Sequence, residues 1–255
     1  MQKTWLVVPC YNEADRLEPD AFVTAVTSTP GLGFVLVNDG SRDATLDVLE
    51  KLRARAPEQL VVENLEKNSG KAEAVRRGVL RAFDLGAELT GYWDADLATP
   101  LRFIPDFAKL LEREELVMAF GSRVQMLGRR VQRNPMRHYI GRGFATLAAL
   151  SLGVPVYDTQ CGAKLFKTTP ALRSAFEKPF TLRWSFDVEF LGRLIERQLE
   201  VGDIDVERQC AEFPLEEWID APGSKLTTAH FPRIAYEMAS MFVRLRSVRA
   251  MKALR

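Results

Sequence analysis

The sequence predicts an α/β domain, in which a mostly parallel central sheet is flanked by helices. Short apolar runs rich in β-branched residues alternate with longer segments of helical periodicity, which is typical of successive βαβ units. The length of 255 residues and the hydrophobic share of 47% allow a sizeable core. Because neither a repeat nor a linker interrupts this pattern, we expect residues 1–229 to form one domain.

Five apolar runs are expected to be strands of the sheet, at residues 5–8, 34–37, 60–62, 90–93 and 116–120. Between them, the helical spacing of apolar residues predicts helices at 43–56 and 72–85, with Asp43 as the cap of the first. A third helix is expected at 100–111, because Pro100 is tolerated in a first helical turn.

The second half of the chain is less regular. It is predicted to contain helices at 135–152 and 187–197, and strands at 163–166 and near 204–208. The tail, residues 230–255, has five Arg and one Lys against one Glu, and its apolar residues recur at helical spacing. We expect a basic amphipathic helix there, either packed on the domain or in contact with an anionic membrane surface.

The composition argues against several classes of protein. With 35 Lys plus Arg against 34 Asp plus Glu, the net charge of +1 speaks against a nucleic-acid partner recognised through bulk positive charge. The three cysteines are far apart, so neither a disulfide framework nor a zinc site is indicated. Residues 143–157 form an uncharged stretch that is too short to span a membrane. We expect a cytoplasmic location, with peripheral contact to the cytoplasmic face of a membrane as a further option.

Polar residues follow each of the first four predicted strands, in segments 9–13, 38–41, 68–71 and 94–96. The carboxyl ends of parallel strands share one edge of a sheet, where open α/β sheets bind their ligands. Asp94 and Asp96 are the most informative pair, because two carboxylates at a strand end can hold a divalent cation on a diphosphate. We therefore expect a ligand site at this edge, with Mg²⁺ or Mn²⁺ as its cofactor.

Other phosphate-binding and nucleophilic motifs are missing from the sequence. Residues 69–72 are similar to the end of a P-loop, but Leu65 occupies the position of its first glycine and Ala72 that of its metal-binding hydroxyl residue. No G-x-G-x-x-G motif follows the first strand, and neither H-E-x-x-H nor G-x-S-x-G occurs. The sequence therefore argues against P-loop, dinucleotide-binding and serine-hydrolase chemistry.

Several segments, taken in order, resemble one family. They are Pro-Cys-Tyr-Asn-Glu at 9–13, Asn-Asp-Gly-Ser-Arg-Asp at 38–43, Asn-Ser-Gly-Lys at 68–71, Asp-Ala-Asp at 94–96, Gly-Ser-Arg at 121–123 and Asp-Thr-Gln-Cys-Gly-Ala-Lys-Leu-Phe at 158–166. This combination is similar to family-2 glycosyltransferases of GT-A fold, and within them to the dolichyl-phosphate or polyprenyl-phosphate β-glucosyltransferase group. Arg-Trp-Ser-Phe-Asp-Val-Glu at 183–189 and Gly-Ser-Lys at 223–225 extend the resemblance, which spans residues 9–225.

The resemblance implies a donor site for a nucleotide sugar, with a UDP-hexose as the donor. Its residues would be Pro9, Tyr11, Glu13, Asp39, Lys71, Asp94 and Lys225. Asp39 would accept hydrogen bonds from the nucleoside. Asp96, a catalytic residue in this scheme, would hold the metal on the diphosphate with Asp94 beside it, and Lys225 would add a positive charge there.

The resemblance also implies an acceptor side. Asp158, the second catalytic residue, and Gln160 match its motif. Arg123 and Arg137 belong to an arginine-rich stretch at 123–137 that would bind the acceptor phosphate. Asp158 would act as general base towards a hydroxyl acceptor. A polyprenyl phosphate is largely dianionic at pH 7, so with this acceptor Asp158 would instead orient it or complete the metal shell.

These expectations combine into one hypothesis, an inverting transferase that moves one hexose, glucose from UDP-glucose, onto a polyprenyl or dolichyl phosphate. Processive members of the family carry Gln three residues before Arg-Trp, whereas Phe180 stands there in this chain, which favours transfer of a single sugar. Apolar residues at 144–152 and the basic tail would meet the membrane surface. The alternatives are a GDP-mannose-dependent mannosyltransferase, a transferase for a soluble acceptor, and a nucleotide-sugar-binding module without catalysis.

Overall fold

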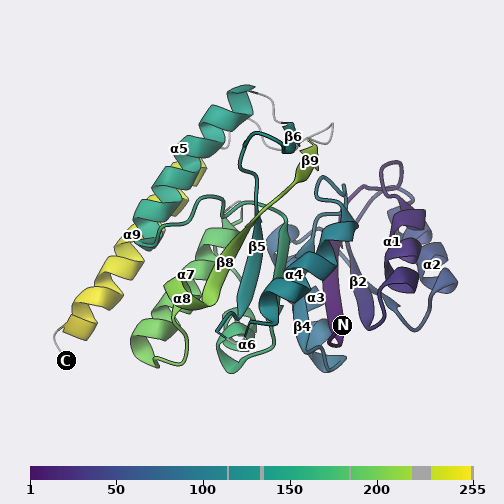
Figure 1. Cartoon of the computed structure of the whole chain (residues 1–255), viewed down its shortest axis with the longest axis horizontal. Coiled ribbons are helices and arrows are strands. Elements are labelled where there is room, and N and C mark those ends of the chain that lie inside the picture. The colour runs from purple at the N-terminus through teal and green to yellow at the C-terminus, as the bar shows by residue number, and fades with distance from the viewer. Residues whose placement is uncertain (114, 133–134, 184, 220–230, 254–255) are drawn as a thin grey trace.

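The computed structural model describes residues 1–113, 115–132, 135–183, 185–219 and 231–253. Over these residues the chain forms a seven-stranded sheet covered by helices, and a separate two-stranded sheet (Figure 1). The strand order of the large sheet is β3-β2-β1-β4-β7-β5-β8. Its strands are β1 (Thr4–Cys10), β2 (Leu32–Asp39), β3 (Leu60–Leu65), β4 (Leu89–Trp93), β5 (Met118–Ser122), β7 (Ala163–Lys167) and β8 (Cys210–Pro214).

The large sheet is mostly parallel, as the sequence predicts. Strands β1 to β4 run parallel to one another, and β5 is parallel to β8. Strand β7 lies between β4 and β5 and is antiparallel to both. Trp93 at the end of β4 pairs with Ala163 at the start of β7, so β7 begins at the edge of the sheet where β4 ends. The apolar run at 163–166 predicts this strand but not its direction.

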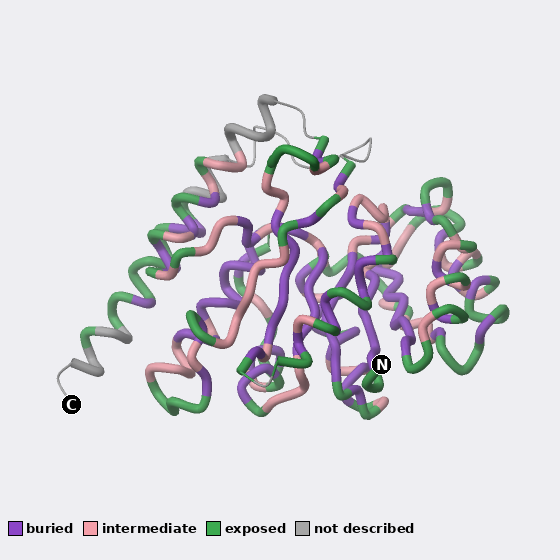
Figure 2. The backbone as a smooth tube through the Cα atoms, in the orientation of Figure 1, coloured by how far each residue is buried: buried purple, intermediate pink, exposed green. Residues whose placement is uncertain are grey.

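Helices cover both faces of the sheet. They are α1 (Pro19–Ser28), α2 (Thr45–Arg55), α3 (Lys71–Asp84), α4 (Ile104–Leu111) after the 3-10 turn η1 (Leu101–Phe103), α5 (Pro135–Leu152), α6 (Pro170–Glu177), α7 (Phe186–Glu200), α8 (Val206–Gln209) and α9 (Phe231–Ala253). Alternate residues of β1 point to opposite faces. Val7 belongs to the core under α3, α6 and α7, whereas Leu6 and Val8 belong to the core under α1, α2 and α4. The buried strands run through the middle of the molecule (Figure 2).

The structure corrects two local expectations. The strand expected near 204–208 is wrong, because the side chain of Asp205 accepts a hydrogen bond from Arg208 N and caps the short helix α8, after which β8 begins at Cys210. Asp43 was expected to cap the helix at 43–56, but α2 begins at Thr45 without a side-chain cap. The Asp43 carboxylate instead accepts from Thr45 N at 3.0 Å, which forms a turn just before the helix.

The tail forms a helix that lies beside α5 (Figure 1). Met238, Met241 and Leu245 of α9 are buried in the core that α7 also lines, whereas Tyr236 and Val243 are exposed. A small parallel pair, β6 (Arg130–Gln132) with β9 (Glu217–Ile219), lies near the end at which α5 begins (Figure 1). Among the described residues, the structure contains no helix with the length and apolar character needed to cross a membrane.

Candidate active site

The loops that follow β2 and β3 are joined through Asp39. Its buried carboxylate accepts hydrogen bonds from Ser69 N at 2.7 Å, from Gly70 N at 2.9 Å and from Asn68 Nδ2 at 3.0 Å. Burial raises the pKa of Asp39, although the Ser69 and Gly70 amides act in the opposite direction. A carboxylate has about four acceptor positions, so these bonds leave capacity for a ligand hydroxyl.

Close contact between the same two loops depends on Gly40. This residue has a φ of 60°, a left-handed conformation that glycine adopts without steric cost. A Cβ atom at this position would lie 2.4 Å from the backbone nitrogen of Asn68. The Asn-Asp-Gly segment therefore brings the end of β2 against the segment that opens α3.

The loop after β1 is attached to the loop after β2. Glu13 N donates to Thr45 Oγ1 at 2.8 Å, and Arg42 N donates to Asn12 Oδ1 at 2.9 Å. The buried Glu13 side chain, expected to bind the donor, accepts from Arg16 Nε at 2.8 Å and from Arg16 Nη2. In this structure the Glu13 carboxylate therefore fixes its own loop, next to Pro9 and Tyr11 at the end of β1.

Asp94 and Asp96 follow β4 at the same edge, together with Lys71 from the start of α3. Lys71 Nζ lies 2.6 Å from Asp94 Oδ1, and Asp96 Oδ1 accepts from Ala98 N at 3.1 Å. Burial, and then the neighbouring charge of Asp94, raise the pKa of Asp96. Burial alone would lower the pKa of Lys71, but the charges of Asp94 and Asp187 raise it. The carboxylates are therefore only partly neutralised by the protein.

A divalent cation fits this pair of carboxylates if the substrate supplies further ligands. Among the described residues there is no group of three or more His, Cys, Asp or Glu side chains placed to hold a metal ion. Magnesium, however, is commonly bound by one or two carboxylates plus substrate phosphates and water. Asp94 and Asp96 could therefore hold Mg²⁺ or Mn²⁺ together with a diphosphate.

The loop formed by residues 158–162 precedes β7 and lies at the same edge of the sheet, on the side of β4 that faces away from β1. Asp158 is buried and accepts from Arg123 Nε at 2.6 Å and from Arg123 Nη2 at 2.8 Å. Its own backbone nitrogen donates to Glu212 Oε1 at 2.8 Å, and Gln160 N donates to Asp158 Oδ1 at 3.1 Å. The Arg123 guanidinium also lies 5.2 Å from the ring centroid of Trp218. Arg123 and Asp158 thus form a bidentate ion pair, the geometry that is strongest between these groups.

Sequence reasoning missed three charged residues at this edge. Lys164 and Asp187 form a buried ion pair at 2.7 Å behind the 158–162 loop. The Arg183 guanidinium lies beside the loop after β3, where its Nη2 would be 3.5 Å from a Cβ atom placed on Gly70. A lysine within the apolar strand 163–166 was the available signal for the first pair, because lysine is almost never fully buried unless it is paired.

The structure thus gathers most of the predicted site residues at one edge of the sheet. Contacts link the segments of Asp39 and Lys71, and Asp94 N donates to Gly162 O at 2.9 Å, which brings the 158–162 loop next to Asp94. Of the remaining predicted residues, Lys225 and the side chain of Arg137, which falls in α5, lie outside the described residues.

This fold, with polar loops and paired carboxylates at the carboxyl edge of the sheet, is that of a GT-A glycosyltransferase. The family profile of Glycosyl transferase family 2 matches residues 5–172. The chain belongs to this family and is a glycosyltransferase by class.

Curated relatives match most of the chain. A dolichyl-phosphate beta-glucosyltransferase from Trichomonas vaginalis is 30% identical, with 96% of this chain and 72% of the relative covered. The dolichyl-phosphate beta-glucosyltransferase of Drosophila melanogaster is 34% identical, with 87% of this chain and 68% of the relative covered. The human protein of that name is 31% identical over the same shares.

Solved structures support the fold. Glucosyl-3-phosphoglycerate synthase from Mycobacterium tuberculosis, in complex with UDP, has a TM-score of 0.63 at 17% identity, covering 96% of this chain and 80% of the other. The same enzyme with Mn²⁺, UDP-glucose and phosphoglyceric acid has a TM-score of 0.62 at 15% identity, covering 96% and 79%. At this level of identity the likeness concerns the fold alone.

Gly162→Ala is expected to disturb the site, because an added methyl group would lie 1.8 Å from Asp94 Oδ2. Overpacking of this kind costs about 1–3 kcal/mol, and a displacement of about 1 Å at a reacting centre can lower turnover a hundredfold. Thermal unfolding and transferase assays measure both effects. The matched control is Gly143→Ala in α5, where an added Cβ meets nothing within 4 Å and stability should rise slightly. Equal behaviour of the two variants would contradict the prediction.

Proposed function

We propose that this glycosyltransferase moves one glucose from UDP-glucose to a polyprenyl or dolichyl phosphate, with inversion at the anomeric carbon. The observation that carries the proposal is the likeness, over 87–96% of the chain, to relatives named dolichyl-phosphate beta-glucosyltransferase. Their identity to this chain, 30–34%, is about twice that of the glucosyl-3-phosphoglycerate synthase of known structure.

The donor half of the proposal rests on the residues at the carboxyl ends of β1 to β4. Asp39 would accept hydrogen bonds from the nucleoside, since its carboxylate keeps acceptor capacity beside the loop after β3. Asp94 and Asp96 would hold Mg²⁺ or Mn²⁺ on the diphosphate. When bound, the cation would neutralise charge on the departing UDP. Lys71, 2.6 Å from Asp94, would fix the orientation of that carboxylate.

The acceptor half of the proposal is consistent with the ion pair that Asp158 forms with Arg123. A phosphate monoester has a second pKa of about 6, so the acceptor oxygen is already deprotonated at pH 7. That oxygen attacks the anomeric carbon as the bond from this carbon to the UDP oxygen breaks, and no proton has to be removed. Asp158, bound by Arg123 on both carboxylate oxygens, suits an orienting role better than that of a general base.

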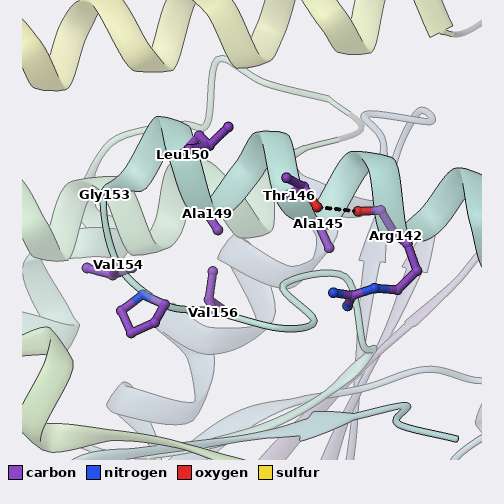
Figure 3. Close-up of a pocket in the computed structure, with 9 residues that line it drawn as sticks. Arg142, Ala145, Thr146, Ala149, Leu150, Gly153, Val154 and Val156 are labelled. Carbon is purple, nitrogen blue, oxygen red and sulfur yellow. Dashed lines mark hydrogen bonds between the residues drawn. The ribbon is translucent and has the colours of Figure 1, made fainter.

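An apolar cavity of 460 Å³ next to the 158–162 loop suits the lipid part of such an acceptor. It lies between α5 and the segment 153–156, with Ala149 and Val156 on its walls and Arg142 at one end (Figure 3). Arg142 Nη1 donates to Tyr157 O at 3.2 Å, and its guanidinium lies 3.7 Å from the Tyr157 ring centroid. Tyr157 precedes Asp158, so a phosphate near Arg142 would place the adjoining isoprene units in this cavity.

Helices α5 and α9 would bring the protein to the membrane that holds such a lipid. Both carry exposed large apolar side chains, which are Leu147, Leu150, Tyr236, Phe242 and Val243. The tail of the chain is also strongly basic. Apolar side chains combined with basic ones favour peripheral binding to an anionic surface. We place this contact at the cytoplasmic face.

The proposal predicts that purified protein with labelled UDP-glucose, Mg²⁺ and a short-chain polyprenyl phosphate forms a labelled lipid. UDP with Mg²⁺ should also raise the melting temperature more than GDP does, because a ligand at a hundred times its Kd adds about 2.7 kcal/mol of stability. GDP-mannose, 3-phosphoglycerate and a reaction without acceptor are the controls.

Each result that contradicts the proposal would favour one of the alternative functions. A lipid product from GDP-mannose alone would make the protein a mannosyltransferase. A product with 3-phosphoglycerate, and none with the lipid, would overturn the acceptor. Stabilisation by UDP without turnover of any acceptor tested would favour a binding module.

A further inference from the structure

A buried ionic cluster, formed by Lys164, Asp187 and Tyr92, lies behind the edge that carries Asp94. Lys164 on β7 has 0% of its surface exposed. Its Nζ donates to Asp187 Oδ1 at 2.7 Å, and Tyr92 OH donates to the same oxygen. A buried ion pair is weak evidence for stability, because desolvation of the two charges offsets their attraction. Stability alone therefore does not account for a charged pair at this position.

The two remaining hydrogens of the Lys164 ammonium hold the 158–162 loop. Nζ donates to Thr159 O at 2.9 Å and to Cys161 O at 2.6 Å. These carbonyl groups flank Gln160, one of the predicted acceptor residues. An ammonium group has three hydrogens, and all three are used here. Lys164 therefore fixes the loop on both sides of Gln160.

The same cluster is connected to the donor side. Tyr92 lies on β4 two residues before Asp94, and Asp94 N donates to Gly162 O, at the end of the loop that Lys164 holds. Asp187, in the first turn of α7, is one of the carboxylates whose charge acts on Lys71. Positive and negative groups thus alternate from Lys164 through Asp187 and Lys71 to Asp94.

We propose that Lys164, held by Asp187 and Tyr92, is a positioning residue that sets the 158–162 loop against Asp94 and so aligns the acceptor with the bound donor. The proposal rests on the proposed function and adds to it the group that couples the two halves of the site. Lys164 itself contacts neither substrate, because its three hydrogens are bonded within the protein.

The test is the double variant Lys164→Met/Asp187→Asn, which removes both buried charges and keeps a partner for Tyr92 OH. The fold and UDP affinity should be retained. The kcat/KM for polyprenyl phosphate should fall about a hundredfold, since the loop carbonyl groups have lost their donor and the acceptor is misplaced. Hydrogen exchange should accelerate in peptides covering 158–162 while the later turns of α7 stay protected.

The matched control is Arg197→Met/Asp203→Asn, which removes an ion pair of 2.7 Å near the other end of α7. This variant should keep the lipid kinetics and the exchange of the 158–162 loop. The proposal is overturned if Lys164→Met/Asp187→Asn keeps wild-type kcat/KM, or if UDP affinity and lipid transfer fall together. If the wild-type protein itself does not glucosylate the lipid, the proposed function fails separately. Hydrogen exchange then decides the positioning role, which faster exchange confined to the loop supports and unchanged exchange overturns.

Discussion

Asp96→Asn is expected to lower glucosyl transfer about 10²–10³-fold while raising the melting temperature of the ligand-free protein. The loss follows because the carboxylate would hold charge-neutralising Mg²⁺ or Mn²⁺ on the diphosphate, and removing one electrostatic contact of this kind has effects of that size. The gain follows because Asp96 is ionised at a cost in the folded protein, where burial and the charge of Asp94 raise its pKa. Transfer assays and calorimetry measure the two effects.

The gain in stability should depend on pH in a definite direction. An acid whose folded pKa is raised above its ordinary value of 3.8 binds its proton more tightly in the folded state. Ionisation of Asp96 therefore lowers the free energy of unfolding as the pH rises from that value through the folded pKa. The melting temperature of Asp96→Asn should match that of the wild-type protein near pH 4 and exceed it at pH 7.

The control for both effects is Asp84→Asn, which changes an exposed carboxylate at the end of α3. It should leave turnover unchanged and show no comparable pH-dependent gain. UDP with Mg²⁺ should stabilise this control as it stabilises the wild-type protein, and should stabilise Asp96→Asn much less. Full activity of Asp96→Asn would remove Asp96 from the catalytic scheme.

The sequence predicts the sheet edge that carries the site well, because that edge is formed by strand ends and by the polar residues that follow them along the chain. Strands of β-branched residues end at Cys10, Asp39, Leu65 and Trp93, and the polar residues that follow them meet because parallel strands share their carboxyl edge. The contact of Lys71 with Asp94 follows from that arrangement. The family resemblance adds the expected assignment of residues to a donor side and an acceptor side, which periodicity alone does not contain.

What the sequence does not predict depends on contacts between distant segments. The reversed direction of β7 places Lys164 beside Asp187. A lysine within an apolar strand indicates that it has a partner, but no local pattern identifies Asp187 as that partner. Arg123 was expected to hold a phosphate, yet its guanidinium is bonded to Asp158, 35 residues away. A strand was predicted where the short helix Val206–Gln209 lies. The spacing of apolar residues favours a strand there, but the side chain of Asp205 caps a helix instead.

Arg123→Met and Asp158→Asn are each expected to destabilise the protein by about 3–5 kcal/mol, because each leaves one member of a buried ion pair without its partner. The side chains are 15% and 8% exposed, so solvent screens the remaining charge little. The double variant should recover a large part of that stability, since no uncompensated charge remains. A double-mutant cycle by chemical denaturation measures the coupling.

The kinetics of the same three variants separate the two roles considered for Asp158. If Asp158 orients the acceptor through its bond to Arg123, both single variants detach the 158–162 loop and should lose lipid glucosylation to a similar extent. The double variant should then stay impaired although its stability recovers. A general base would behave differently, because Asp158→Asn would lose a further 10²–10⁴-fold relative to Arg123→Met and would flatten the acid limb of the pH profile. With an acceptor that is already a dianion, we expect the first pattern.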